Sequence, residues 1–321
     1  MRSFSGVPRD QRGVFVKELS DSVDDGIDRA AELGLGGAHL NSPLEVDPAL
    51  DPGALAAFAD RAAALGLRLG VGVGSLNPFR PDRSPEAFTA GRGDLDRGFF
   101  ALVAASVSLG CHTPMVVVGR EEDRFASPTP WTDQLAAVGA LLTRLAPALR
   151  ELGARVLIKT HQELTTFEAA RLVESVGSDV TGVAFDPTNS IVRMEHPVTA
   201  ASRLAGLIGQ VHVDDARLVA WGDGLGRALV PIGGGDVDWT AVVAAVASTD
   251  PTAMWWGEIH RAELTMPFRQ AGWMTAHPDA PLNEIATWLG TAAGQSEPTP
   301  ATLLGDLPAR IDAVTAALGW D

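Results

Sequence analysis

Lys159, His161 and Glu163 lie close together at the end of a short apolar stretch, 155-RVLIKTHQEL-164. If this stretch is a β-strand, Lys159 and His161 share a face, because side chains two residues apart in a strand point the same way. An amine, an imidazole and a carboxylate in one place can bind an ion or move a proton. We therefore treat all three as candidate catalytic residues.

A second set of chemically capable side chains follows three later apolar stretches. Asp186 ends 180-VTGVAFD-186, His212 lies near the end of 208-IGQVHVD-214, and Glu258 lies near the end of 253-AMWWGEIH-260. Carboxylates and imidazole are competent ligands for divalent cations. A shared ion is the simplest reason to bring them together, so we expect these three residues to form a metal site.

Eight short β-like stretches recur along the chain, separated by Ala- and Leu-rich segments with helical periodicity. The alternation of strand and helix, with strands that are apolar on both faces, is typical of a parallel sheet. Eight such units predict an α/β fold, a single (β/α)8 TIM barrel. An open doubly wound sheet would want a glycine-rich phosphate turn after its first strand, and 19-LSDSVDD-25 has none. The predicted strands are 14–19, 36–40, 67–73, 115–119, 155–161, 180–186, 208–214 and 253–260.

The last part of the chain does not continue this alternation of strand and helix. We assign residues 1–290 to the barrel and residues 291–321 to a C-terminal loop and helix packed on it. The piece 294-GQSEPTP-300 has the composition of an exposed loop before the last helix.

In such barrels the working residues lie at the carboxyl ends of the strands. This rule selects four further polar residues as candidates for binding substrate: His39, Asn77, Arg217 and His260. Arg217 is expected to reach the barrel mouth and to clamp a hydroxyl, carboxylate or phosphate group.

Composition narrows the range of partners. The formal net charge of −15 repels phosphate backbones and anionic lipid heads, so we expect neither nucleic acid nor a membrane as a partner. No apolar run approaches the length of a membrane span. The single Cys111 and a start without an apolar signal segment lead us to expect a cytoplasmic protein.

Four segments resemble the xylose-isomerase-like barrels, which include sugar phosphate isomerases and epimerases, inosose dehydratases and relatives of endonuclease IV. They are 182-GVAFDPTN-189, 211-VHVDD-215, 230-VPIGGGDVDW-239 and 256-WGEIH-260. The resemblance runs from about residue 14 to residue 260. It implies a Mn, Mg, Co or Zn ion held by Asp186, His212 and Glu258, together with a glutamate on the fifth strand.

The chain departs from the family pattern on that fifth strand. Where the family has glutamate, any residue and histidine, this chain has Lys159, Thr160 and His161. A protonated lysine has no lone pair with which to bind a metal. Two alternatives follow. Either His161 or Glu163 becomes the fourth ligand, or the Lys159 ammonium replaces the ion and pairs with Asp186 and Glu258.

The resemblance implies a metal-dependent enzyme that removes a proton from the carbon next to a carbonyl of a sugar, cyclitol or keto-sugar, giving isomerisation, epimerisation or elimination. A narrower alternative is the catalytic subunit of a C-glycoside deglycosidase, a lyase that works with a small partner chain. Five tryptophans could serve its aromatic aglycone: 131, 221, 255, 256 and 273. An alternative of another class is a non-catalytic sugar-binding barrel that has lost its metal. We also expect a homo-oligomer, or a complex with a second chain, through the apolar residues of 262–274.

Overall fold

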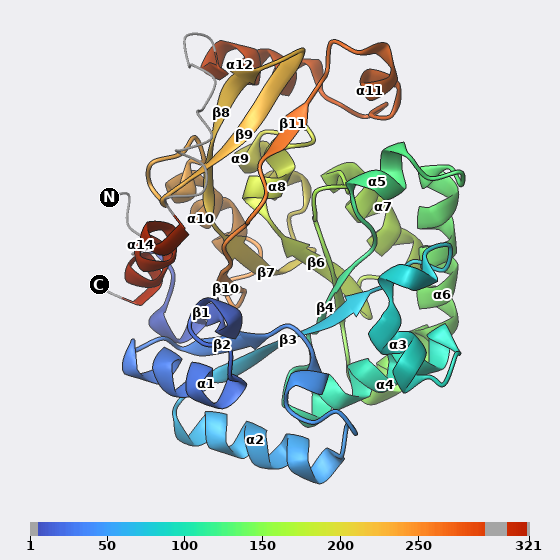
Figure 1. Ribbon diagram of the computed structural model, residues 1–321, viewed down its shortest axis with the longest axis vertical. Coiled ribbons are helices and arrows are strands. Elements are labelled where there is room, and N and C mark those ends of the chain that lie inside the picture. Colours follow the sequence, from blue (N-terminus) through green and yellow to red (C-terminus); the bar gives the residue numbers. More distant parts are fainter. Residues whose placement is uncertain (1–5, 293–306, 320–321) are drawn as a thin grey trace.

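The computed structural model describes residues 6–292 and 307–319, and its centre is a closed barrel of eight parallel strands (Figure 1). Each of the eight predicted stretches overlaps one barrel strand, so the predicted TIM barrel is confirmed. Around the barrel the strands follow the order β1-β10-β7-β6-β5-β4-β3-β2. Their bounds are β1 Arg12–Phe15, β2 Gly37–Leu40, β3 Arg68–Ser75, β4 Met115–Val117, β5 Val156–Lys159, β6 Thr181–Phe185, β7 Ile208–Val213 and β10 Met254–Gly257.

Helices surround the strands on the outside of the barrel (Figure 1). Many begin with a side-chain cap, which satisfies backbone N–H groups that have no partner within the helix. Thr165 and Glu168, for example, form a reciprocal capping box at the start of α7. The helices are α1 Val23–Glu32, α2 Pro52–Ala64, α3 Pro85–Ala90, α4 Leu95–Ser108, α5 Glu121–Phe125, α6 Trp131–Leu152, α7 Thr166–Val176, α8 Pro187–Ile191, α9 Pro197–Arg203, α10 Trp239–Ala247, α11 Ala271–Thr275, α12 Leu282–Ala292 and α14 Leu307–Gly319.

The barrel interior is filled beneath the mouth by one large side chain, Trp256. A Cβ atom at Gly13 on β1 or at Gly70 on β3 would overlap its indole ring, so glycine at these two positions makes the room that the ring needs. Phe15, Met115 and other apolar side chains complete this inner core. The packed floor closes the lower part of the barrel and leaves the carboxyl ends of the strands as the place for a site.

A small antiparallel sheet, absent from our sequence-based assignment, stands beside the barrel next to α12 (Figure 1). It consists of β8 Asp215–Trp221, β9 Gly224–Val230 and β11 Leu264–Met266. In the segment 262–274, whose apolar residues we expected to be exposed, Met266 and Trp273 are buried within the chain itself. These two side chains are therefore not available to cover a neighbouring subunit.

The C-terminal helix α14 packs against β1 and β10. Its Val314 and Leu318 are buried and lie over Gly257. The expected loop at residues 294–300 lies outside the described residues. Within residues 6–292 and 307–319, no helix is long and apolar enough to cross a membrane.

Candidate functional site

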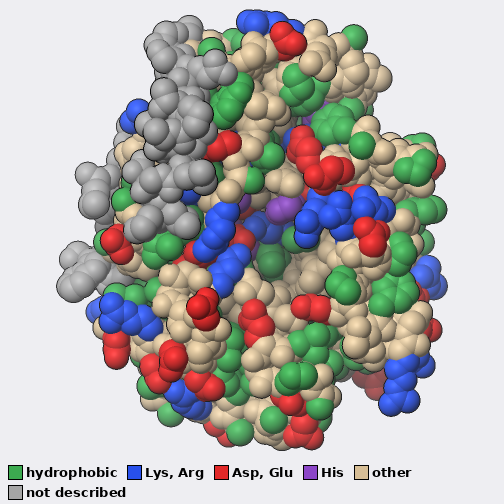
Figure 2. Space-filling view, viewed as in Figure 1, with side chains coloured by type: hydrophobic (Ala, Val, Ile, Leu, Met, Phe, Trp, Pro, Cys, Tyr) green, Lys and Arg blue, Asp and Glu red, His purple; other side chains and the backbone are tan. Residues whose placement is uncertain are grey.

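A cavity of about 510 Å3 opens at the carboxyl ends of the barrel strands. Its wall includes Lys159, His161 and Glu258, and apolar contact comes from Phe15 and Met115. Figure 2 shows the hollow near the middle of this face, with Lys and Arg side chains and acidic side chains gathered around it. The cavity thus combines charged groups with an apolar floor, as small-molecule sites do.

Lys159 ends β5 and lies between two carboxylates. Its Nζ donates a hydrogen bond to Oε2 of Glu258 and lies 3.4 Å from Oδ2 of Asp186. The lysine side chain is only 3% exposed. Burial alone would lower the pKa of Lys159, but the charges of Glu258 and Asp186 outweigh it and the pKa is raised. Lys159 is therefore a buried cation at physiological pH.

Asp186 is held by several partners at the end of β6. It caps the short helix α8 by accepting a hydrogen bond from the backbone N–H of Asn189, and it accepts another from the Asn189 side chain. Nε2 of His260 lies 3.0 Å from Asp186 Oδ2, and Nδ1 of His260 lies 2.9 Å from Oδ2 of Asp214. Burial would raise the pKa of Asp186, but His260 and Lys159 lower it. Asp186 is a carboxylate whose oxygens are already engaged.

His212 is held in one tautomer by a chain of hydrogen bonds. The indole Nε1–H of Trp256 donates to Oε1 of Gln210, so the amide nitrogen of Gln210 faces His212 Nε2 at 3.2 Å. His212 Nε2 must then accept a hydrogen bond. The hydrogen on Nδ1 is donated to Glu258 Oε2 at 2.6 Å. Burial and the charge of Lys159 lower the pKa of His212, which agrees with a neutral ring.

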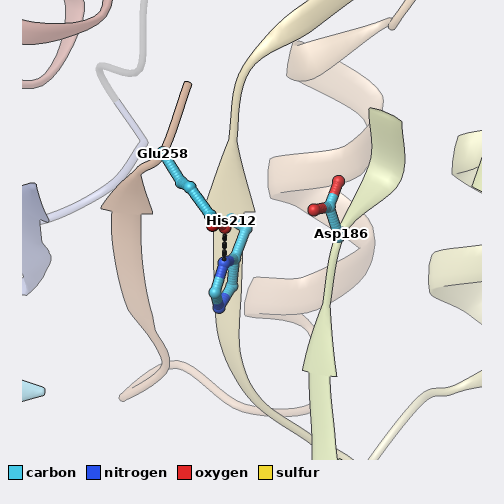
Figure 3. A group of neighbouring side chains, drawn as sticks. All are labelled: Asp186, His212 and Glu258. Carbon is cyan, nitrogen blue, oxygen red and sulfur yellow. Dashed lines mark hydrogen bonds and ion pairs between the residues drawn. The ribbon is translucent and has the colours of Figure 1, made fainter. Parts of the chain in front are cut away.

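The expected metal residues do come together. Figure 3 shows Asp186, His212 and Glu258 at the ends of β6, β7 and β10, with His212 hydrogen-bonded to Glu258. Single ligand atoms of the three residues lie within 4.8 Å of one another, so they are a candidate metal-binding group.

The residues around this group do not fit a divalent ion. The ammonium of Lys159 contacts the two carboxylates that would bind the ion. Both ring nitrogens of His212 are occupied, one as a donor and one as an acceptor, so neither offers a free lone pair. The site is arranged as a closed hydrogen-bonded network around an ammonium group.

His161 lies outside that group and forms a separate pair with Glu163. Its Nδ1 lies 2.6 Å from Oε2 of Glu163, whose side chain is fully buried. The structure does not bring His161 or Glu163 to the Asp186, His212 and Glu258 group as a fourth ligand. In the neutral imidazole, with Nδ1–H donated to the carboxylate of Glu163, Nε2 carries the lone pair, and His161 lines the cavity.

The four residues expected to bind substrate occupy other positions. Among the described residues that border the cavity, His39, Asn77, Arg217 and His260 are absent. His39 is buried against Phe15, and Asn77 donates to Gln134. Arg217 lies on β8, where it donates to the carbonyl of Gly234. His260 lies between Asp186 and Asp214 and is hydrogen-bonded to both.

Two residues with clear roles at the site were not identified from the sequence. Gln210 sets the tautomer of His212, and strand alternation could have identified it, because it lies two residues earlier on the same strand. Arg310 on α14 donates to Oδ2 of Asp214 at 2.6 Å. No local pattern connects residues 96 positions apart in the chain.

The same fold occurs in solved structures of sugar epimerases. D-psicose 3-epimerase, determined in the presence of D-fructose, matches 88% of this chain and 100% of its own, with 18% identity and a TM-score of 0.61. D-psicose 3-epimerase with D-tagatose from Clostridium cellulolyticum H10 matches 90% and 100%, with 14% identity and a TM-score of 0.63. The 3-keto-D-glucoside 4-epimerase YcjR of E. coli matches 86% and 99%, with 15% identity and a TM-score of 0.58. At these identities the likeness shows the fold.

Sequence comparison gives a partial relative and a family. The uncharacterized protein YihM of Escherichia coli K12 is 29% identical over 111 residues, which is 35% of this chain and 34% of YihM. The chain thus matches about a third of that relative's length. The family model described as xylose isomerase-like TIM barrel matches residues 27–273. The chain therefore belongs to the xylose isomerase-like TIM barrel family.

Proposed function

We propose that this protein is a carbohydrate isomerase or epimerase that removes a proton from the carbon next to a carbonyl group. The observation that carries the proposal is the pairing of two groups at one cavity: the imidazole of His161, oriented by a buried carboxylate, and the buried ammonium of Lys159. A base and a fixed positive charge are what enediolate chemistry requires.

In the proposed reaction Nε2 of His161 takes the proton from the substrate carbon. The electron pair of the broken C–H bond forms the carbon–carbon double bond, and the carbonyl π electrons move to oxygen. Of the three N–H bonds of Lys159, two face Glu258 and Asp186, which leaves one to donate to that oxygen. Return of the proton from His161 to the neighbouring carbon, with transfer of the hydroxyl proton from one oxygen to the other, gives the isomer. Delivery of a proton from a water molecule to the opposite face of the same carbon, with loss of the His161 proton to solvent, gives the epimer.

The structural neighbours support a small carbohydrate as the substrate. They include D-psicose 3-epimerase and 3-keto-D-glucoside 4-epimerase, enzymes of sugars that carry a carbonyl. The Mn, Mg, Co or Zn ion expected from the family resemblance enters no step proposed for this chain, because Lys159 contacts two of its three candidate ligands.

Elimination of an aglycone from a 3-oxo-sugar would begin with the same proton removal. The tryptophans invoked for an aromatic aglycone do not favour that outcome. Among the described residues that line the cavity there is no tryptophan, and Trp131, Trp255, Trp256 and Trp273 are buried. We therefore prefer isomerisation or epimerisation.

Hydrogen exchange with solvent tests the proposal without knowledge of the product. The protein is incubated in D2O with D-psicose, D-tagatose, D-fructose and 3-keto-glucosides, and deuterium uptake beside the carbonyl is followed by NMR. We expect uptake with at least one sugar. His161→Gln should lower its rate at least about 100-fold, since a positioned acid or base contributes factors of this order.

The matched control is His112→Gln. His112 is exposed, precedes β4 at the other end of the barrel and contacts the carbonyl of Gly153. The His112→Gln variant should catalyse deuterium uptake into the sugar at the wild-type rate. Absence of exchange with every sugar, combined with measurable sugar binding, would support a non-catalytic barrel instead. Equal rates for the two histidine variants would remove His161 from the mechanism.

A further inference from the structure

The whole sequence contains two lysines, Lys17 and Lys159, although it has 25 basic residues of the Lys and Arg types. All the remaining residues of these two types are arginine. Both lysines contact the same carboxylate, Glu258. Lys17 Nζ lies 3.3 Å from Oε1, and Lys159 Nζ donates to Oε2. Lysine is thus confined to the one place where a small cation sits against the candidate metal ligands.

The chemical difference between the two basic side chains explains this placement. Arginine carries a broad planar guanidinium that spreads its charge over three nitrogens, whereas lysine ends in a compact point charge with three donors. A compact cation fits between Glu258 and Asp186, as a metal ion would. Lys159 is only 3% exposed, and its ammonium lies against both carboxylates.

We propose that the ammonium of Lys159 takes the place of the divalent ion implied by the family, so that this barrel works with a built-in organic cation and binds no catalytic metal. The displacement of the ion rests on the contacts of Lys159 alone. The use of the ammonium to stabilise the substrate's oxyanion rests on the proposed function.

The hydrogen-bonded surroundings agree with an ammonium rather than a metal. His212 presents its Nδ1 hydrogen to Glu258, and a metal at either ring nitrogen would have to break the contact with Glu258 or the contact with Gln210. Asp186 Oδ2 already accepts from Asn189 and lies within hydrogen-bond distance of His260. A metal ion would therefore have to displace hydrogen-bond partners that Asp186 and His212 already have.

Manganese binding tests the proposal directly. Wild-type protein and the variants Lys159→Glu, Lys159→Met and Lys17→Met are purified without chelator. Their metal content is measured by elemental analysis, and Mn2+ binding is titrated by electron paramagnetic resonance of the free ion. Wild type and Lys17→Met should carry well under one equivalent and show no saturable binding. Lys159→Glu supplies the missing carboxylate, and should bind one Mn2+ at least about tenfold more tightly than wild type.

Lys159→Met keeps the experiment decisive if Lys159→Glu does not fold, as judged by circular dichroism. It removes the ammonium without adding a ligand, so it should bind Mn2+ more tightly than Lys17→Met. Lys17→Met is the matched control, because it removes a cation from Glu258 and leaves the space between the carboxylates filled. Near-stoichiometric metal in the wild type, or equal Mn2+ affinity in Lys159→Met and Lys17→Met, would overturn the proposal.

These measurements separate the two proposals. A wild type that binds one Mn2+ and also exchanges substrate hydrogen would refute the built-in cation and leave the isomerase proposal standing. A wild type that binds no metal and exchanges no hydrogen with any sugar would refute the isomerase proposal and leave the built-in cation standing.

Discussion

Lys159 is both buried and positively charged. These two properties seldom occur together, since a charge taken out of water is costly unless a partner of opposite sign is close. The two carboxylates that hold it are themselves kept ionised by it. Burial would raise the pKa of Glu258, but the charge of Lys159 lowers it well below its ordinary value. The three side chains therefore depend on one another for their charge.

The titration of Lys159 can be observed directly, because a sample labelled at the lysine Cε carbons has two signals to assign. We expect the Lys159 signal to keep its charged position through pH 10.5, the ordinary lysine pKa, because the neighbouring carboxylates raise the pKa in the folded state. The stability that the raised pKa contributes is fully present below pH 10.5 and is lost as the pH rises through the folded-state value. A Lys159 midpoint below 10.5 would show that burial dominates instead.

Loss of the ammonium should also slow catalysis. With Lys159→Met the developing oxyanion loses a donor, and removal of one such donor typically costs about 100- to 1,000-fold in kcat. Hydrogen exchange into the best sugar substrate measures the effect, with Lys17→Met for comparison. A change in kcat/KM of less than about threefold, which is about 0.7 kcal/mol of transition-state stabilisation, would leave Lys159 with a structural role.

At the scale of elements, the parallel strands were predicted from the sequence and the added sheet was missed. Strands such as 115–119 and 180–186 are largely apolar on both faces, which is a signal that local sequence carries. The β8–β9 hairpin is different, because its sequence was treated as a connection. Its signal was nevertheless present, since Gly222 and Asp223 separate two short runs and Gly222 adopts a positive φ of 52°.

In the candidate site, too, some features followed from the sequence and others did not. Strand ends placed Asp186, His212 and Glu258 correctly, because carboxyl ends of parallel strands meet at one rim. Beyond Lys159 the rule of alternation no longer applies, since β5 ends there and the backbone N–H of His161 turns back to the Lys159 carbonyl. The pairing of His161 with Glu163 is therefore a property of a turn that strand periodicity cannot describe.

The contact between α14 and β10 gives a prediction for an element boundary. Gly257→Ala should destabilise the protein by about 1–3 kcal/mol, as overpacking does, because the new Cβ meets Val314. The double variant with Val314→Ala should recover part of that loss. Urea unfolding of each single variant and the double variant measures the coupling.

Gly272→Ala is the matched control, since open space surrounds that position. It should unfold within about 0.5 kcal/mol of wild type. Additive losses from Gly257→Ala and Val314→Ala would mean that α14 does not press on β10 in solution.

Across the whole molecule, the buried His277 links stability to pH. Arg193 donates to its Nε2 at 2.8 Å, and its Nδ1 lies 2.7 Å from the carbonyl of Trp273, so the ring is held neutral. Burial and the charge of Arg193 lower the pKa of His277 to about 2. The unfolded chain takes up this proton below its ordinary pKa of 6.5 while the folded chain does not, so stability falls as the pH falls through 6.5.

Comparison with His277→Gln isolates this effect from other titrating groups. Glu195 acts in the opposite direction, because burial raises its pKa to about 7 and the folded chain binds that proton. It is unchanged in the variant. The advantage of wild type over His277→Gln should therefore shrink by about 1–2 kcal/mol between pH 7 and pH 5. Urea unfolding at both pH values provides the measurement, and a constant difference would show that His277 is protonated in the folded state.

The confinement of lysine to Glu258 has a consequence for covalent modification. Lys17 has a 34% exposed side chain and Lys159 is buried, so acylation of a lysine side chain in the native protein falls on Lys17. Acetylation removes the positive charge of a lysine. In most proteins such an event is scattered over many surface positions. In this chain it can modify only Lys17, which contacts the carboxylate of Glu258 at the centre of the site. Any lysine acetylation of the folded protein therefore removes a positive charge from the candidate site.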